Sequence, residues 1–235
     1  MDIHINVFYV IPIGGIEIWI TNTVISMWVI MGLLIALAIA VRINMRKWKE
    51  VPTGFQNAIE AIVDLFENYV RSITGDRLLF LGSWFFTVFA FILLSNIGGI
   101  FPFFRPPTAD WSITIGLAMV TFFLIQIMAL RYRKLEYVRS LFQPLPWYIP
   151  LFLPMNLISE FARPISLSFR LFGNMLGGLI LMALVYNVAP LFARFVIPAA
   201  LHGYFDLFAG VLQTYIFVTL SMTFIAGSSE IPEST

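Results

Sequence analysis

The stretch MNLISEFARPISLSFRLFGNMLGG, residues 155–178, decides how the rest of the chain must be arranged. It is mostly apolar, yet it carries Glu160, Arg163 and Arg170. Arg170 has no acidic residue within nine positions on either side, and 23 uncharged residues separate it from Arg194. Such an arginine lies in or near the middle of a membrane, where insertion scales put its cost at about 2.5–3.5 kcal/mol. This cost indicates that Arg170 has a function.

The composition is typical of a polytopic membrane protein. Of 235 residues, 60% are hydrophobic and only 11% are charged, whereas a soluble domain carries about 25% charged residues. The net charge of +1 suggests no nucleic-acid partner. The chain has no cysteine and only two histidines, His4 and His202, so we expect neither a metal site nor a cofactor. The N-terminus lacks the basic region of a signal peptide, so we expect the first apolar run to be retained.

Long uncharged runs before and after residues 155–178 predict five membrane segments in a single domain over residues 1–235. Three are ordinary spans, at 18–41, 78–104 and 111–130, and two are longer, at 155–189 and 195–228. At 1.5 Å per residue, each is long enough to cross a hydrocarbon core of about 30 Å. The last two would reach roughly 50 Å if helical, so they must tilt or run partly outside the membrane. We therefore predict an all-α polytopic membrane protein that ends in a long, tilted hairpin.

Residues 51–75 have a different pattern. Apolar residues recur there at the i, i+3, i+4, i+7 spacing of a helix, while the opposite face is polar and mostly acidic. This predicts an amphipathic helix on the cytoplasmic surface, with a capping box from Thr53 and Gln56 and a stop at Gly75. Anionic lipid would repel the acidic face, so we expect protein to hold the helix; an ordinary solvated surface helix is the alternative. Four prolines in residues 143–154 predict an irregular linker.

The basic residues predict the orientation of the chain. Ten fall at one set of segment ends: Arg42, Arg46, Lys47, Lys49, Arg71, Arg77, Arg131, Arg133, Lys134 and Arg139. Only Arg105 and Arg194 fall at the other ends, and Arg163 and Arg170 lie within a segment. By the positive-inside rule, the first set is cytoplasmic. The N-terminus is then outside and the C-terminus inside.

Both long segments carry a polar stripe. If the first segment is helical, one of its faces holds Arg163, Ser166, Arg170, Asn174 and Gly177. One face of the second segment likewise holds His202, Asp206, Gly210 and Gln213. Two such stripes facing each other predict a hydrated path through the bilayer. The alternative is an Arg170–Asp206 salt bridge that ties the hairpin together. In the second span, Asn96 either forms a hydrogen bond between packed helices or lines the path.

The chemistry of Arg170 narrows its role. A guanidinium stays charged under all ordinary conditions, so it cannot donate or accept a proton in a relay. It attracts ionised carboxylates and repels a cation that tries to pass straight through. These properties favour a gate between two half-paths.

The residues just described resemble the subunit a family of the F-type ATP synthase membrane sector. RPISLSFRLFGNMLGG (163–178) matches the family's signature around its essential arginine, VLQTYIFVTLSMTFIA (211–226) its C-terminal helix, and SNIGGIFPF (95–103) its second-span motif. The resemblance covers nearly the whole chain. It implies a bacterial plasma-membrane stator subunit whose partners are lipid, a rotating ring of c subunits, the peripheral stalk subunit b and the rest of the synthase.

The resemblance also implies roles for individual residues. Arg170 would separate two half-channels and meet the carboxylate of each passing c subunit, with Ser166, Asn174 and Gln213 near it and Asn96 at the family's second-span polar position. Glu160 would lie at the inner exit, and Asp206, with His202 one turn earlier, in the outer half-channel. Some members of the family carry further acidic residues at the positions of Leu179 and Gly99, so the resemblance implies a less polar outer path here than in those members. Protons are the default ion.

The resemblance gives the subunit no catalytic nucleotide site, so we expect ion translocation but no enzymatic step of its own. A secondary transporter or an ion channel subunit is the alternative class. A transporter would usually show two related halves, and we find no repeat. An intramembrane hydrolase would need a nucleophile or a third ligand beside His202 and Asp206, and none is evident in the sequence.

Overall fold

The computed structural model describes residues 7–13, 16–52, 54–101, 104–134, 137, 153–188, 190 and 193–229. Five helices in this part of the chain are long and apolar enough to span a membrane: Asn22–Asn44, Asp76–Gly98, Trp111–Arg133, Pro154–Val188 and Ile197–Ser229. They confirm the predicted all-α polytopic membrane protein. Thr53 of the predicted capping box and residues 143–152 of the predicted linker lie outside the described residues.

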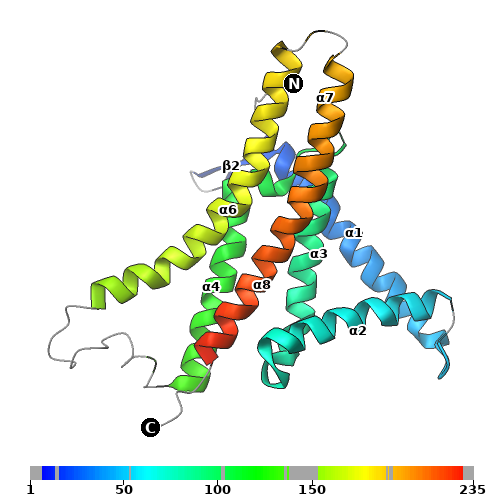
Figure 1. The fold of residues 1–235 in the computed structure, drawn as a ribbon, viewed down its shortest axis with the longest axis vertical. Helices are drawn as coiled ribbons and strands as arrows, with labels where there is room; N and C mark the ends of the chain where they lie inside the picture. Colours follow the sequence, from blue (N-terminus) through cyan, green and yellow to red (C-terminus); the bar gives the residue numbers. More distant parts are fainter. Residues whose placement is uncertain are drawn as a thin grey trace.

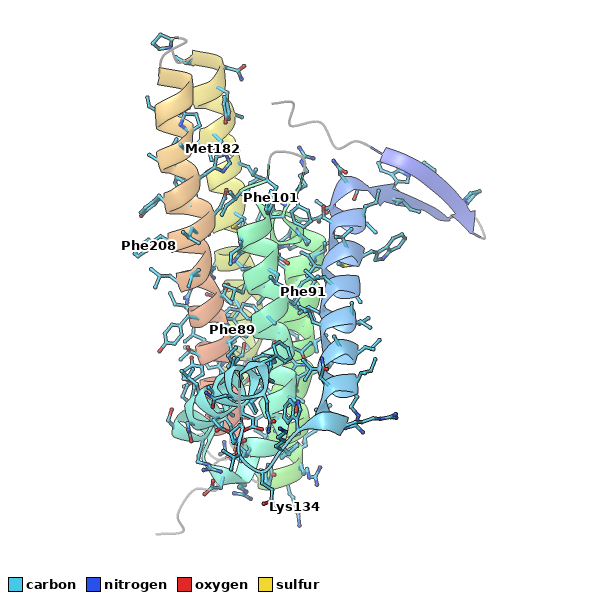
Figure 2. The ribbon with its side chains drawn as sticks, turned by 90° about the vertical axis from the view of Figure 1, so that its right-hand side faces the viewer. Phe89, Phe91, Phe101, Lys134, Met182 and Phe208 are labelled. Carbon is cyan, nitrogen blue, oxygen red and sulfur yellow. The ribbon has the colours of Figure 1, made fainter. Side chains whose placement is uncertain are left out.

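A β-hairpin precedes the first span, and we did not predict it. Strands β1 (Val7–Ile13) and β2 (Ile16–Thr21) pair antiparallel, so residues 18–21, expected in the first helix, belong to a strand. Two runs rich in β-branched residues flank the Gly14–Gly15 dipeptide, which is a recognised hairpin signal. The uncharged run after Glu17 indicates a helix from residue 18, but its first four residues continue strand β2. Figure 2 shows the hairpin extending sideways from the top of α1.

Helix α1 (Asn22–Asn44) touches the bundle only near its start. Its buried residues are Thr23, Ser26 and Ile30, and nearly every side chain beyond them is exposed. The Thr23 hydroxyl donates to the Asp110 carboxylate at 3.1 Å and fixes this end. The rest of α1 slopes away from α3 (Gly82–Gly98) (Figure 1), so lipid or another protein must cover it. A short 3₁₀ turn, η1 (Met45–Lys47), follows it.

The predicted amphipathic helix is α2 (Phe55–Thr74), and Gly75, at a φ of 67°, ends it as expected. Its apolar side packs on the chain's own bundle, where Phe66 and Val70 are buried in the main core. Tyr69 stacks on Tyr215 of α8 (Gly210–Ser229), and its hydroxyl lies 2.5 Å from that of Thr219. These contacts show that protein holds this helix, as the acidic outer face led us to expect.

The core lies where α2, α3, α4 (Trp111–Arg133), α6 (Leu153–Val188) and α8 meet. Its buried apolar side chains include Phe85, Ile92, Ile125, Leu171, Phe217, Met222 and Ile225. Helix α8 is central, since it contacts α2, α3, α4 and α6. Lipid is as apolar as these side chains, so close van der Waals packing holds the helices together rather than the exclusion of water.

The second span is shorter than predicted. The 3₁₀ turn η2 (Asp76–Leu81) leads into α3, which stops at Gly98 because the chain folds back there. A Cβ on Gly98 would lie 2.4 Å from the Phe104 ring, so only glycine admits this return. A further 3₁₀ turn, η3 (Pro107–Ala109), then leads to the Asp110 cap of α4.

The last two segments form the predicted long hairpin. Helix α6 has 36 residues, roughly 54 Å at 1.5 Å per residue. The second arm is built from α7 (Ala193–His202), η4 (Gly203–Ala209) and α8. The top of the hairpin rises beyond the other spans, and the lower part of α6 diverges from α8 (Figure 1). Segment η4 is π-helical, which we did not predict.

Candidate functional site

Arg170 lies on an exposed face of α6, while the opposite face carries the buried Leu167, Leu171 and Met175. No hydrogen bond or ion pair from any described residue reaches its guanidinium. On the same exposed side, a Cβ on Gly173 or Gly177 would meet nothing within 4 Å. The charge therefore stands on a shallow surface that a large body can approach.

Asp206 pairs with His202 and not with Arg170. The His202 Nδ1 and Asp206 Oδ2 atoms lie 2.5 Å apart, one helical turn from each other. Asp206 is only 7% exposed. The salt bridge that would tie the hairpin through Arg170 is therefore not formed.

Gly99 lies against Asp206. A Cβ on Gly99 would lie 3.2 Å from Asp206 Cγ and 3.0 Å from the Pro106 ring. A side chain at this position would crowd Asp206, so the neighbours would have to shift. Leu179, the other position that the resemblance associates with an acid, is half-buried on α6.

Asn96 is fully buried and joins three elements. Its Nδ2 donates to the Gly210 carbonyl at 2.9 Å and to the Thr214 hydroxyl at 3.2 Å. Its Oδ1 accepts from the Thr108 hydroxyl at 2.7 Å. With every polar atom used inside the protein, Asn96 matches the packing interpretation.

The two polar stripes meet at few points. Ser166, Arg170 and Gly177 are exposed, whereas Asp206 of η4 and Gln213 of α8 are buried. Among the described residues, one hydrogen bond joins α6 to the second arm, from Asn174 Nδ2 to the Ala209 carbonyl at 3.3 Å. The charge of the first stripe is thus exposed, while the carboxylate of the second stripe is buried. The π-helical turn contributes to this, because it breaks the α-helical spacing on which the second stripe was drawn.

Gln213 is buried, and its Nε2 has no hydrogen-bond partner among the described residues. A buried donor without a partner costs about 1–3 kcal/mol. Such a group calls for an explanation in terms of function or bound water.

Glu160 lines a cavity of about 400 Å³ near the ends of α4, α6 and α8. It forms an ion pair with Arg163 at 3.0 Å and accepts a hydrogen bond from Gln126 Nε2 at 3.3 Å. The Tyr137 hydroxyl donates to Gln126 Oε1 at 2.6 Å. Burial, aided by the negative Glu160, raises the pKa of Tyr137, so this hydroxyl stays a neutral donor.

Gln126 and Tyr137 were not among the residues we selected from the sequence. The signal for Gln126 was its being the sole side-chain amide in the third span. Tyr137, in a basic segment, gave no such signal.

Comparison with known proteins agrees with this arrangement. The family model described as ATP synthase A chain matches residues 24–226. The chain is 35% identical to "ATP synthase subunit a, sodium ion specific" of Propionigenium modestum, over 89% of this chain and 74% of the relative. It is 36% identical to ATP synthase subunit a of Oleidesulfovibrio alaskensis, over 97% and 91%. The corresponding protein of Moorella thermoacetica is 33% identical, over 95% and 96%.

The matched region contains the exposed arginine, the buried Asp206 and Gln213, three of the five apolar helices in full and nearly all of the first and last. The chain is therefore a multi-pass membrane protein that belongs to the ATP synthase A chain family, the ion-translocating subunits of the bacterial ATP synthase membrane sector.

Proposed function

We propose that this chain forms two offset half-channels against a rotating ring of c subunits and so couples ion flow to ATP synthesis. The observation that carries the proposal is Arg170, a permanent charge on an exposed, shallow face with no partner among the described residues. An unpaired charge at membrane depth is costly unless a counter-charge arrives from elsewhere. A carboxylate on each passing c subunit supplies it. Ser166 and Asn174 border Arg170 on α6, and Gln213 offers its free Nε2 to this exchange.

The outer half-channel runs to Asp206. The His202–Asp206 pair at 2.5 Å supports this, because two titratable groups in contact can hand on a proton. Asn96 fixes the helix beside the path rather than lining it.

The inner half-channel leaves through the cavity at Glu160. Its lining of Arg163, Asn156, Ser159 and Ser228 supports a hydrated exit, since each of these side chains can hold water. On this proposal Arg170 lies between the inner cavity and the outer carboxylate, and it blocks direct passage of a cation.

In the membrane, the N-terminal hairpin is outside and the C-terminus is cytoplasmic, as the distribution of lysine and arginine favours. Besides the c-ring, the partners are the peripheral stalk subunit b, the remaining synthase subunits and lipid. The exposed length of α1 supports a neighbour on that side. The translocated ion is the proton; ATP hydrolysis that depends on sodium in the whole complex would overturn that choice.

The test is Arg170→Ala in the assembled synthase. We expect ATP-driven ion pumping into membrane vesicles to fall to background, while the complex still assembles, because the exposed side chain contributes nothing to the described core. Arg131→Ala, at an exposed position near the end of α4, is the matched control and should pump normally. Coupled pumping in Arg170→Ala would exclude the proposed role.

A further inference from the structure

A π-helical turn interrupts the last membrane segment. In η4 the Gly210 N–H is shared between the Leu207 carbonyl, three residues earlier, and the Phe205 carbonyl, five residues earlier, and the second is the π-helical bond. Such turns occur mostly as single insertions within α-helices. The extra residue rotates the side chains before it by about 100° around the helix axis, relative to the side chains after it. This is the rotation that one residue adds in an α-helix. Asp206 lies inside this turn, so the turn decides where its carboxylate points.

Two asparagines bond the carbonyls at the end of the π-helical turn. Asn174 of α6 donates to the carbonyl of Ala209, and Asn96 of α3 donates to that of Gly210. The two carbonyls are consecutive, and the two amides reach them from different helices. Gly210 permits the approach, because a Cβ there would lie 2.9 Å from the Asn96 Cβ. The junction between π-helix and α-helix is thus held from two sides.

The π-helical turn fits its neighbours closely. A Cβ on Gly178 would lie 3.1 Å from the Phe205 Cβ, so α6 touches the turn there. On the other side, Asp206 lies against Gly99, where a Cβ would lie 3.2 Å from Asp206 Cγ. Collapse of the turn to a regular α-helix would rotate both Phe205 and Asp206 out of these positions.

We propose that Asn96 and Asn174 are positioning residues that hold the last helix in its π-helical turn and thereby keep Asp206 against Gly99. The placement stands on the hydrogen bonds and contacts alone. Its consequence for ion flow rests on the proposed function, in which Asp206 serves the outer half-channel. The asparagines act through the helix backbone and need not touch the ion.

Because the chain has no cysteine, a disulfide can report the turn. The reporter pair is Gly178→Cys with Phe205→Cys, whose Cβ atoms would lie 3.1 Å apart, so a shift of a few tenths of an ångström reaches the 3.5–4.5 Å of a disulfide. We would measure its rate of oxidative cross-linking in the assembled synthase in membranes, alone and combined with Asn96→Leu and Asn174→Leu. Leucine keeps the branched shape and the number of side-chain heavy atoms and removes the donors. The control pair is Thr114→Cys with Ser168→Cys, whose native hydroxyls lie 3.2 Å apart between α4 and α6.

We expect the reporter pair to cross-link several-fold more slowly without the asparagines, while the control pair is unaffected. Restoring Asn174 in the double variant should recover part of the rate. An unchanged reporter rate would overturn the positioning role, whatever happens to ion flow. The readout needs no pumping, so the expected result would stand even if Arg170→Ala pumped normally and the proposed function failed.

Discussion

At the scale of single residues, Asp206 is the proposed outer carboxylate. Asp206→Asn keeps the shape of the side chain and removes its ability to take up and release a proton, so we predict slower ion entry from the outer side. Asp64→Asn, on the exposed face of α2, is the matched control and should leave entry unchanged. Proton flux into vesicles that contain the reconstituted synthase measures both. Equal flux in the two variants would make Asp206 a structural residue.

Two helix glycines provide a stability test. Gly98→Ala would place a Cβ 2.4 Å from the Phe104 ring, and we predict that this overpacking destabilises the fold by about 1–3 kcal/mol. Gly116→Ala meets nothing within 4 Å and should stabilise α4 by up to about 1 kcal/mol. Thermal unfolding in detergent, followed by tryptophan fluorescence, separates them. A Gly98→Ala protein as stable as the parent would mean that the chain can reopen at Phe104 without cost.

The polar residues of the site were predictable because each interrupts an apolar run. Arg170, Asp206 and Gln213 are conspicuous for that reason alone. Their partners were not predictable, since a hydrogen bond between residues distant in the chain, such as Asn96 to Gly210, depends on how the helices cross. The charge of Arg170 alone leaves open a partner within the chain, and the structure shows only that Asp206, the internal candidate, pairs with His202 instead.

At the scale of elements, the contact of α2 with α8 should depend on pH. Burial raises the pKa of Tyr69, and the nearby Tyr215 adds to the effect. A folded-state pKa above the unfolded value gives stability that is present below about pH 10 and is lost as the pH rises through the folded pKa. We predict that the thermal midpoint falls between about pH 9 and about pH 11, and falls less in Tyr69→Phe.

Tyr69→Phe also removes one hydrogen bond, so at neutral pH it should cost about 0.5–1.5 kcal/mol. Tyr186→Phe, in α6 outside the described core, is the comparison. If Tyr69→Phe and the parent lose stability in parallel at high pH, the hydroxyl pair does not control this contact.

The membrane-spanning helices could be predicted from the length of the uncharged runs, since a membrane span needs only about 20 apolar residues. Elements that depend on finer signals were missed. The hairpin lies directly before the apolar run of α1, and its last residues, 18–21, were assigned to the predicted first helix. The π-helical turn at 203–209 leaves no trace in hydropathy, and the asparagines that bond its end, Asn96 and Asn174, come from other helices.

At the scale of the whole molecule, the three crossings by α1, α3 and α4 would place the hairpin and the end of α4 on opposite sides of the membrane. Figure 2 shows the hairpin at one end of the bundle and Lys134 at the other. We predict that a membrane-impermeant maleimide labels Val10→Cys in intact cells and Lys134→Cys only after the cytoplasmic side is opened. Both positions are exposed and the chain has no other cysteine. Labelling of both from one side would refute the topology.

The hydrogen bonds of Asn96 set an order on the making of the protein. Thr108 emerges 12 residues after Asn96 and satisfies its oxygen at once. The acceptor at Gly210 comes 114 residues later, a wait of about 6 to 23 seconds at a synthesis rate of about 5–20 residues per second. During that interval the Asn96 amide of α3 lacks the Gly210 carbonyl that it bonds in the folded protein. The hydrogen bonds of α3 are therefore complete only after α8 has been synthesised.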